Sequence, residues 1–128
     1  MKTKLHIVGI GITAAALSLA AAAKAADLDT VKVLYIGDTG TPRAQQFTGF
    51  LSKNVGRVEA VSRKDFKPAD AAPFDVVLLD WPQSQTAREE RKGQSPLGDR
   101  AAWNKPTVLL GSAGLNLAVV WKVRGGSG

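Results

Sequence analysis

Three apolar runs along the chain have the pattern of buried β-strands. Residues 31–36, 74–81 and 106–111 are apolar or β-branched at nearly every position, as expected of strands covered on both faces. A fourth run, residues 57–61, alternates between apolar and polar side chains and predicts a shorter strand. Glycine, proline and small polar residues separate these runs and predict turns between them.

A helix is predicted between the first run and the 57–61 run. Thr41 is a typical N-cap residue, and Pro42 suits the first helical position because its missing N–H costs no hydrogen bond there. We expect the helix to continue to about Asn54, with Gly56 as a stop. Its apolar face has i, i+3, i+4 spacing and consists of Phe47, Phe50 and Leu51.

The remaining segments are mostly polar. Residues 62–73 predict at most one or two helical turns, and residues 82–105 predict a long loop with one short helical pattern at 86–92. Residues 117–124 alternate as a strand does. The alternation of strands and helices predicts an α/β fold, a flavodoxin-like and mostly parallel sheet of four to five strands with few flanking helices. So few helices leave sheet surface uncovered, which favours either a truncated longer domain or a chain that depends on a partner.

The first 25 residues have the features of a secretory signal. Lys2 and Lys4 precede an apolar run that ends near Ala23, and Ala23-Lys24-Ala25 has the small residues required at a cleavage site. We therefore predict that residues 1–25 are removed on export and that residues 26–128 form one domain in the periplasm or outside the bacterial cell. The alternative is an uncleaved anchor, and this segment is the one membrane attachment that we expect.

Charge and composition narrow the chemistry. Three of the 17 basic residues and none of the 11 acidic ones lie in the predicted signal, so the mature chain has 14 basic and 11 acidic residues. The chain has no basic stripe with interleaved aromatic residues, so we predict no nucleic-acid partner. The one histidine, His6, lies in the signal, and the chain has no cysteine. Residues 26–128 thus contain no Ser-His-Asp or Cys-His machinery, no histidine- or thiolate-bound zinc and no disulfide.

Between residues 31 and 114 the chain resembles a known group of α/β domains. The segments that carry the resemblance are Val-Lys-Val-Leu-Tyr-Ile-Gly-Asp from Val31, Phe-Asp-Val-Val-Leu-Leu-Asp from Phe74 and Lys-Pro-Thr-Val-Leu-Leu-Gly from Lys105. They resemble flavodoxin-like domains, particularly the glutamine-amidotransferase-like group that includes ThuA-type (trehalose-utilisation) proteins.

Two departures from that group bear on its chemistry. The nearest counterpart of that group's nucleophilic cysteine is Ser112, in Gly-Ser-Ala-Gly at 111–114. The mature chain has no histidine to activate the Ser112 hydroxyl, so we predict no catalytic residue. The loop at 38–41 resembles the FMN phosphate loop of flavodoxins but is one residue short, and Asp38 would repel a phosphate, so we predict no cofactor.

Ligands of open α/β sheets bind at the carboxyl ends of the strands, where three segments of this chain should meet. One hypothesis for this edge is an anion at the helix start beside Arg43. Another is a divalent cation shared by Asp38 and Asp80, although two carboxylates make an incomplete ligand set and we assign no metal residue. The candidate ligand-binding residues are Asp38, Thr39, Gly40, Thr41, Arg43, Asp80, Trp81 and Ser112.

Three interpretations of function follow from these patterns. The first is an exported binding or accessory module for an unknown small molecule or protein partner. The second is a degenerate or metal-dependent hydrolase- or amidotransferase-like enzyme, and the third is a truncated fragment without an independent role. Trp81 and Trp103 bracket the long loop, and they either pack it against the sheet or line a pocket with it.

The signal assignment predicts the mass of the exported protein. When the full-length gene is expressed in a bacterium, the protein recovered from the periplasm or medium should begin at Ala26, which mass spectrometry would show. Replacing Ala25 with Phe should block cleavage because the last residue before the cleavage site must be small. Recovery of the unprocessed chain from the membrane fraction in both cases would support the anchor instead.

Overall fold

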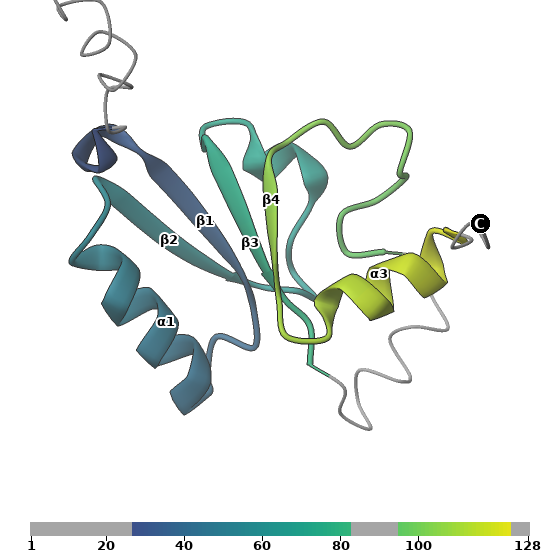
Figure 1. The fold of residues 1–128 in the computed structure, drawn as a ribbon, viewed down its shortest axis with the longest axis horizontal. Coiled ribbons are helices and arrows are strands. Elements are labelled where there is room, and N and C mark those ends of the chain that lie inside the picture. Colours follow the sequence, from purple (N-terminus) through teal and green to yellow (C-terminus); the bar gives the residue numbers. More distant parts are fainter. Residues whose placement is uncertain (1–26, 83–94, 124–128) are drawn as a thin grey trace, which may run out of the picture.

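Four parallel strands form one sheet at the centre of the fold (Figure 1). The computed structural model describes residues 27–82 and 95–123. The spatial order of the strands is β2-β1-β3-β4, and each neighbouring pair is parallel. This arrangement confirms the predicted α/β, flavodoxin-like class. The strands are β1 (Lys32–Gly37), β2 (Arg57–Ser62), β3 (Val76–Asp80) and β4 (Thr107–Leu110).

Helix α1 (Pro42–Ser52) begins as the sequence predicts and ends two residues earlier. The Thr41 hydroxyl oxygen accepts a hydrogen bond from the Ala44 N–H at 3.3 Å, and Pro42 is the first helical residue. The helix lies against the face of the sheet formed by β1 and β3 residues Val33, Tyr35 and Leu78. Phe47 and Leu51 pack there, whereas the predicted contact residue Phe50 is 64% exposed.

The opposite face of the sheet carries the larger core. It is built on strand residues Leu34, Ile36, Val77 and Leu79. A short helix, η3 (Pro68–Ala71), helix α3 (Ala113–Val120) and the segment from residue 95 to 105 cover it. Another short helix, η2 (Leu28–Thr30), precedes β1. The two described α-helices thus lie on opposite faces of the sheet, as Figure 1 shows.

Helix α3 replaces the strand predicted at residues 117–124, and that prediction is wrong. The run is apolar at so many positions that strand and helix periods both fit it. In the structure the helical period prevails because one side of α3 is buried, while Leu115 and Val119 lie exposed on the other. The side facing the core has i, i+3, i+4, i+7 spacing and consists of Ala113, Asn116, Leu117 and Val120.

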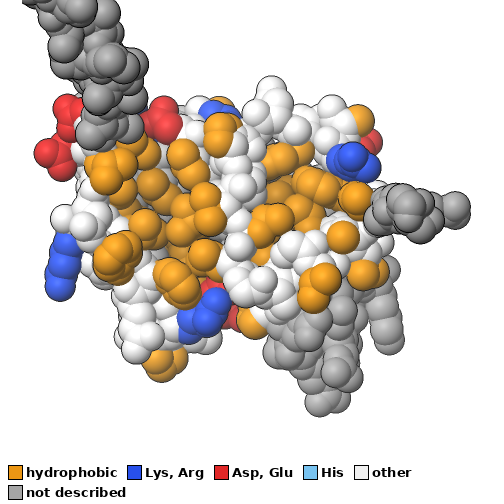
Figure 2. Space-filling view, viewed as in Figure 1, with side chains coloured by type: hydrophobic (Ala, Val, Ile, Leu, Met, Phe, Trp, Pro, Cys, Tyr) orange, Lys and Arg blue, Asp and Glu red, His pale blue; other side chains and the backbone are white. Residues whose placement is uncertain are grey.

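Edge strand β4 is incompletely covered within the described chain. Val108 and Leu109 point to opposite faces of the sheet, yet they are 47% and 41% exposed. Figure 2 shows hydrophobic side chains over the middle of the viewed face, with charged side chains mainly toward its margins. This exposure agrees with the expectation of too few helices. Among the described helices, none is long and apolar enough to cross a bilayer. The predicted helix at 86–92 and the predicted signal lie outside the described residues.

Gly56 has a steric role that differs from the predicted helix stop. Its N–H donates to the Leu28 carbonyl at 3.0 Å, which ties the start of β2 to η2. A Cβ at position 56 would lie 1.9 Å from the Asp29 carbonyl oxygen, and backbone at such a distance has to move. The close approach therefore requires glycine.

Gly56→Ala should lower the free energy of unfolding by about 3 kcal/mol, because overpacking against backbone cannot be relieved by a rotamer change. A drop in Tm of roughly 10–20 °C by circular dichroism would show this. Gly49→Ala is the matched control. That position lies inside α1 with no atom near the added Cβ, so the change should stabilise by about 0.5–1 kcal/mol. Equal effects of the two substitutions would contradict the steric account.

Candidate functional site

The carboxyl ends of the strands bring the predicted site residues to one edge of the sheet. Residues 38–41 follow β1, and Arg43 lies in the first turn of α1. Asp80 is the last residue of β3, and Trp81 follows it. Ser112 precedes α3, just beyond the end of β4. This is the edge at which open α/β sheets place their ligands.

The Asp80 carboxylate is the buried centre of this edge, with 2% of the residue exposed. Its Oδ2 atom accepts hydrogen bonds from the Tyr35 hydroxyl and from Arg43 Nε, each at 2.7 Å. Tyr35 reaches Asp80 because it pairs with Leu78, and every second residue of a strand points to the same face. The buried carboxylate is therefore held by one neutral donor and one charged donor.

Arg43 carries this buried interaction to the surface. Its side chain is 47% exposed, and its guanidinium lies 5.0 Å from the centre of the Phe47 ring. The hydrogen bond to Asp80 raises the pKa of Arg43 further above its ordinary value, so the group is a permanent cation. One terminal nitrogen would lie 3.5 Å from a Cβ at Gly111, so Arg43 also approaches the loop after β4.

Arg63 completes the charge network, and the sequence analysis missed it. Its side chain is 3% exposed, donates to Asp38 Oδ1 at 2.9 Å and donates to the Asp80 carbonyl at 2.9 Å. It lies in the polar segment 62–73, for which we predicted no more than one or two helical turns and no site residue. The signal available was its position, because Arg63 directly follows β2 and parallel strands end at one edge.

These pairings bear on the two ligand hypotheses for the edge. The carboxylates of Asp38 and Asp80 each bind an arginine, so cationic groups of the protein already occupy the place proposed for a divalent ion. Within residues 27–82 and 95–123, no three His, Cys, Asp or Glu side chains are grouped as a metal site would require. For an anion, the two arginines are offset by the two aspartates, so these four described residues together carry no net positive charge.

The loop after β1 is organised by local hydrogen bonds. The Thr41 N–H and hydroxyl both donate to the Asp38 carbonyl, at 3.1 and 2.8 Å. Thr39 and Gly40 lie exposed at the tip, while Asp38 is 46% exposed at its side chain. The loop therefore offers backbone groups and one half-exposed carboxylate to the solvent.

Trp81 and Ser112 have structural contacts at this edge. The Trp81 side chain is fully buried in the core, and Trp103 packs there too, with its ring edge-on to Phe66. Both tryptophans thus pack in the core with Leu97 of the predicted loop, whose residues 83–94 lie outside the described part of the chain. The Trp81 carbonyl accepts from Asn116 Nδ2 at 2.8 Å and from the Ser112 hydroxyl at 3.4 Å.

Three buried polar atoms near the end of β3 have no hydrogen-bond partner within the described chain: Asp80 Oδ1, Trp81 Nε1 and Asn116 Oδ1. A buried polar atom without a partner costs about 1–3 kcal/mol, and native proteins contain few of them. Asp80 Oδ1 lies on the α1 side of the sheet, and the other two atoms belong to residues on the α3 side.

Tyr35 is the chain's one tyrosine, so its ionisation can be followed directly. Burial, and then the hydrogen bond to Asp80, raise the pKa of Tyr35 well above its ordinary value. The stability that the neutral phenol contributes is present below about pH 10, the unfolded pKa, and is lost as the pH rises above it. Tyrosinate absorbance should therefore stay absent in the native protein at about pH 11, while the protein in guanidinium titrates near pH 10.

Tyr35→Phe is the control for this titration. It should abolish the absorbance change and lower the free energy of unfolding at neutral pH by about 1–3 kcal/mol, because Asp80 loses a donor. A native midpoint near pH 10 would mean that water reaches the phenol and would contradict the buried pair.

In comparisons with known proteins, no family model, curated protein or solved structure matches this chain. The resemblance to the glutamine-amidotransferase-like group therefore stays a prediction from the sequence.

Proposed function

We propose that this protein is an exported binding or accessory module, without catalytic activity, whose ligand or partner contacts the carboxyl edge of the sheet. Export rests on the signal-like segment of residues 1–25. The place of binding rests on the network of Arg43, Asp80, Asp38 and Arg63.

The observation that carries the proposal is the way in which two half-exposed charges are anchored. Arg43 is held by the buried carboxylate of Asp80, and Asp38 is held by the buried guanidinium of Arg63. An exposed ion pair usually loses side-chain entropy when it binds a partner. Here part of that entropy is already lost in the free protein, which favours recognition of a ligand.

The arrangement favours binding over catalysis. The Asp80 oxygen that faces Arg43 and Tyr35 accepts two hydrogen bonds, and the Ser112 hydroxyl points to a main-chain carbonyl. Nucleophilic catalysis requires a hydroxyl or thiol beside a base. No histidine or cysteine occurs after residue 25, and the Tyr35 hydroxyl that lies beside the Asp80 carboxylate is buried, with a pKa raised well above its ordinary value.

The charges at the edge indicate the kind of ligand. The Arg43 guanidinium donates from the surface, the Asp38 carboxylate accepts there, and the exposed loop at 39–40 adds backbone groups. A polar small molecule, or a polar segment of a protein partner, with both donors and acceptors would satisfy these groups. Since the charges balance, directional hydrogen bonds rather than net charge would select it.

The test is a ligand titration of the exported protein followed by amide chemical shifts. Inorganic phosphate, FMN, a neutral sugar, Mg²⁺ and Ca²⁺ would be added separately. A binding probe should shift the amides of residues 38–43 and 111–114, and at ten times its Kd it should stabilise the fold by about 1.4 kcal/mol. For a domain of this size, Tm would rise by roughly 5–10 °C.

Arg43→Gln should remove that response, and Arg57→Gln should keep it. The control makes the same charge change at an exposed arginine in the first position of β2, at the opposite edge of the sheet, where it pairs with Glu59. Two results would contradict the proposal: amide shifts confined to places away from the carboxyl edge, or no shift with any probe at about 10 mM.

A further inference from the structure

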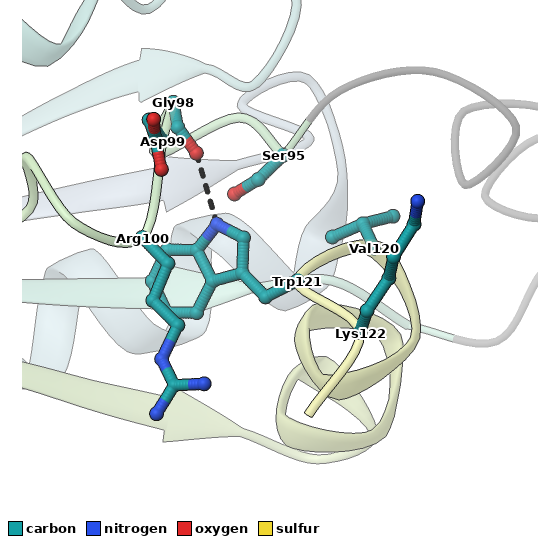
Figure 3. Close-up of a pocket in the computed structure, with 7 residues that line it drawn as sticks. All are labelled: Ser95, Gly98, Asp99, Arg100, Val120, Trp121 and Lys122. Atoms are coloured by element: carbon teal, nitrogen blue, oxygen red, sulfur yellow. Dashed lines mark hydrogen bonds between the residues drawn. The ribbon is translucent and has the colours of Figure 1, made fainter. Parts of the chain in front are cut away.

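A cavity lies at the far end of α3, away from the carboxyl edge. It has a volume of about 350 Å³, within the range of small-molecule sites. The last turn of α3 forms one wall, and the segment from Ser95 to Arg100 forms the other (Figure 3). None of the residues at the carboxyl edge lines it.

The indole of Trp121 is a fixed surface within this cavity. Its Nε1 donates to the Gly98 carbonyl at 2.9 Å, the contact drawn as a dashed line in Figure 3. The hydrogen bond satisfies the polar atom of the ring and fixes its orientation, and the side chain is only partly buried. Together with Val120, the indole provides an apolar wall that can receive an aromatic ring.

Lys122 occupies a backbone position at which glycine is normally favoured. The Lys122 N–H donates to the Val119 carbonyl, and the Val123 N–H donates to the Ala118 carbonyl. These two bonds form a Schellman motif, and Lys122 has the left-handed φ of 51° that the motif requires. A side chain is disfavoured there, yet Lys122 lines the cavity, with its ammonium end directed away from Trp121 and Arg100 (Figure 3).

The charges that line the cavity are unequal. Arg100 and Lys122 are cations, and Asp99 is the one carboxylate. Asp99 also serves the local turn, because its Oδ1 accepts from the Ala101 N–H at 3.0 Å. The cavity therefore combines an aromatic wall with a net positive charge.

We infer that this cavity binds a small aromatic anion, such as an aromatic carboxylate or a phosphate ester. The ring lies against Trp121 and Val120, and the acidic group faces Arg100, while Lys122 adds positive charge at the rim of the cavity. The inference concerns a site separate from the carboxyl edge and does not depend on the function proposed above.

The experiment uses the exported protein and the indole N–H resonance of Trp121, assigned by its loss in Trp121→Phe. Phenyl phosphate and benzoate are the probes, with benzyl alcohol and inorganic phosphate as the neutral and non-aromatic comparisons. Phenyl phosphate should shift the resonance and saturate in the low millimolar range, about 1–5 mM. The two comparison compounds should bind at least about fivefold more weakly, because each lacks one of the two interactions.

Lys122→Gly separates binding from folding. The substitution should raise Tm by roughly 4 °C, because it relieves the left-handed backbone. It should also weaken phenyl phosphate binding about twofold, because it removes a positive charge at the rim. Arg100→Gln removes the cation that faces the acidic group and should weaken binding about three- to tenfold. Lys53→Gly at the end of α1 makes the same residue change away from the cavity and should leave affinity unchanged.

Three results would overturn the inference. The first is no shift of the Trp121 resonance with either anionic probe at about 20 mM. The second is equal affinity for benzyl alcohol and phenyl phosphate, which would remove the role of charge. The third is unchanged affinity in both Lys122→Gly and Arg100→Gln.

Discussion

The buried carboxylate of Asp80 is the interaction on which the carboxyl edge depends. A charge at 2% exposure is costly unless donors surround it, and here the Tyr35 hydroxyl and Arg43 Nε supply them from β1 and α1. Arg63 binds the main-chain carbonyl of the same residue, which adds the segment after β2. One residue at the end of β3 thus joins three neighbouring elements. The positions of Arg43 at the surface and of Asp38 on Arg63 follow from this junction.

The elements of this edge were predictable because each depends on local pattern. Strands β1 and β3 follow from continuous apolar runs, and the start of α1 follows from Thr41 and Pro42. The pairings were not predictable, because they depend on which side chains share a face after the sheet has formed. One hypothesis placed a divalent cation between Asp38 and Asp80. Each instead binds an arginine, and Arg63 lies in a segment whose polar composition resembles any solvated connection.

The end of the chain shows where local pattern fails. From residue 113 to 121 nearly every side chain is apolar, so the spacing of hydrophobic positions does not distinguish a helix from a strand. Tertiary contacts decide between the helix and the strand. As a helix, the segment places Asn116 at the Trp81 carbonyl and buries Leu117 over the sheet. The helix also ends with Trp121 at the Gly98 carbonyl, so the cavity beside it exists only because the segment is helical.

The two regions at opposite ends of α3 differ in the physics of recognition that they allow. At the carboxyl edge two arginines face two aspartates, so long-range attraction for an ion of either sign is weak and hydrogen-bond geometry must provide selectivity. At the Trp121 cavity the described lining carries two cations and one carboxylate that also caps a turn, so charge itself discriminates. At physiological ionic strength, salt screens the interaction of exposed charges beyond about 8–10 Å. Hydrogen bonds to anchored groups depend less on the salt concentration. The ionic-strength dependence of any ligand therefore indicates at which end of α3 it binds, even before its contacts are mapped.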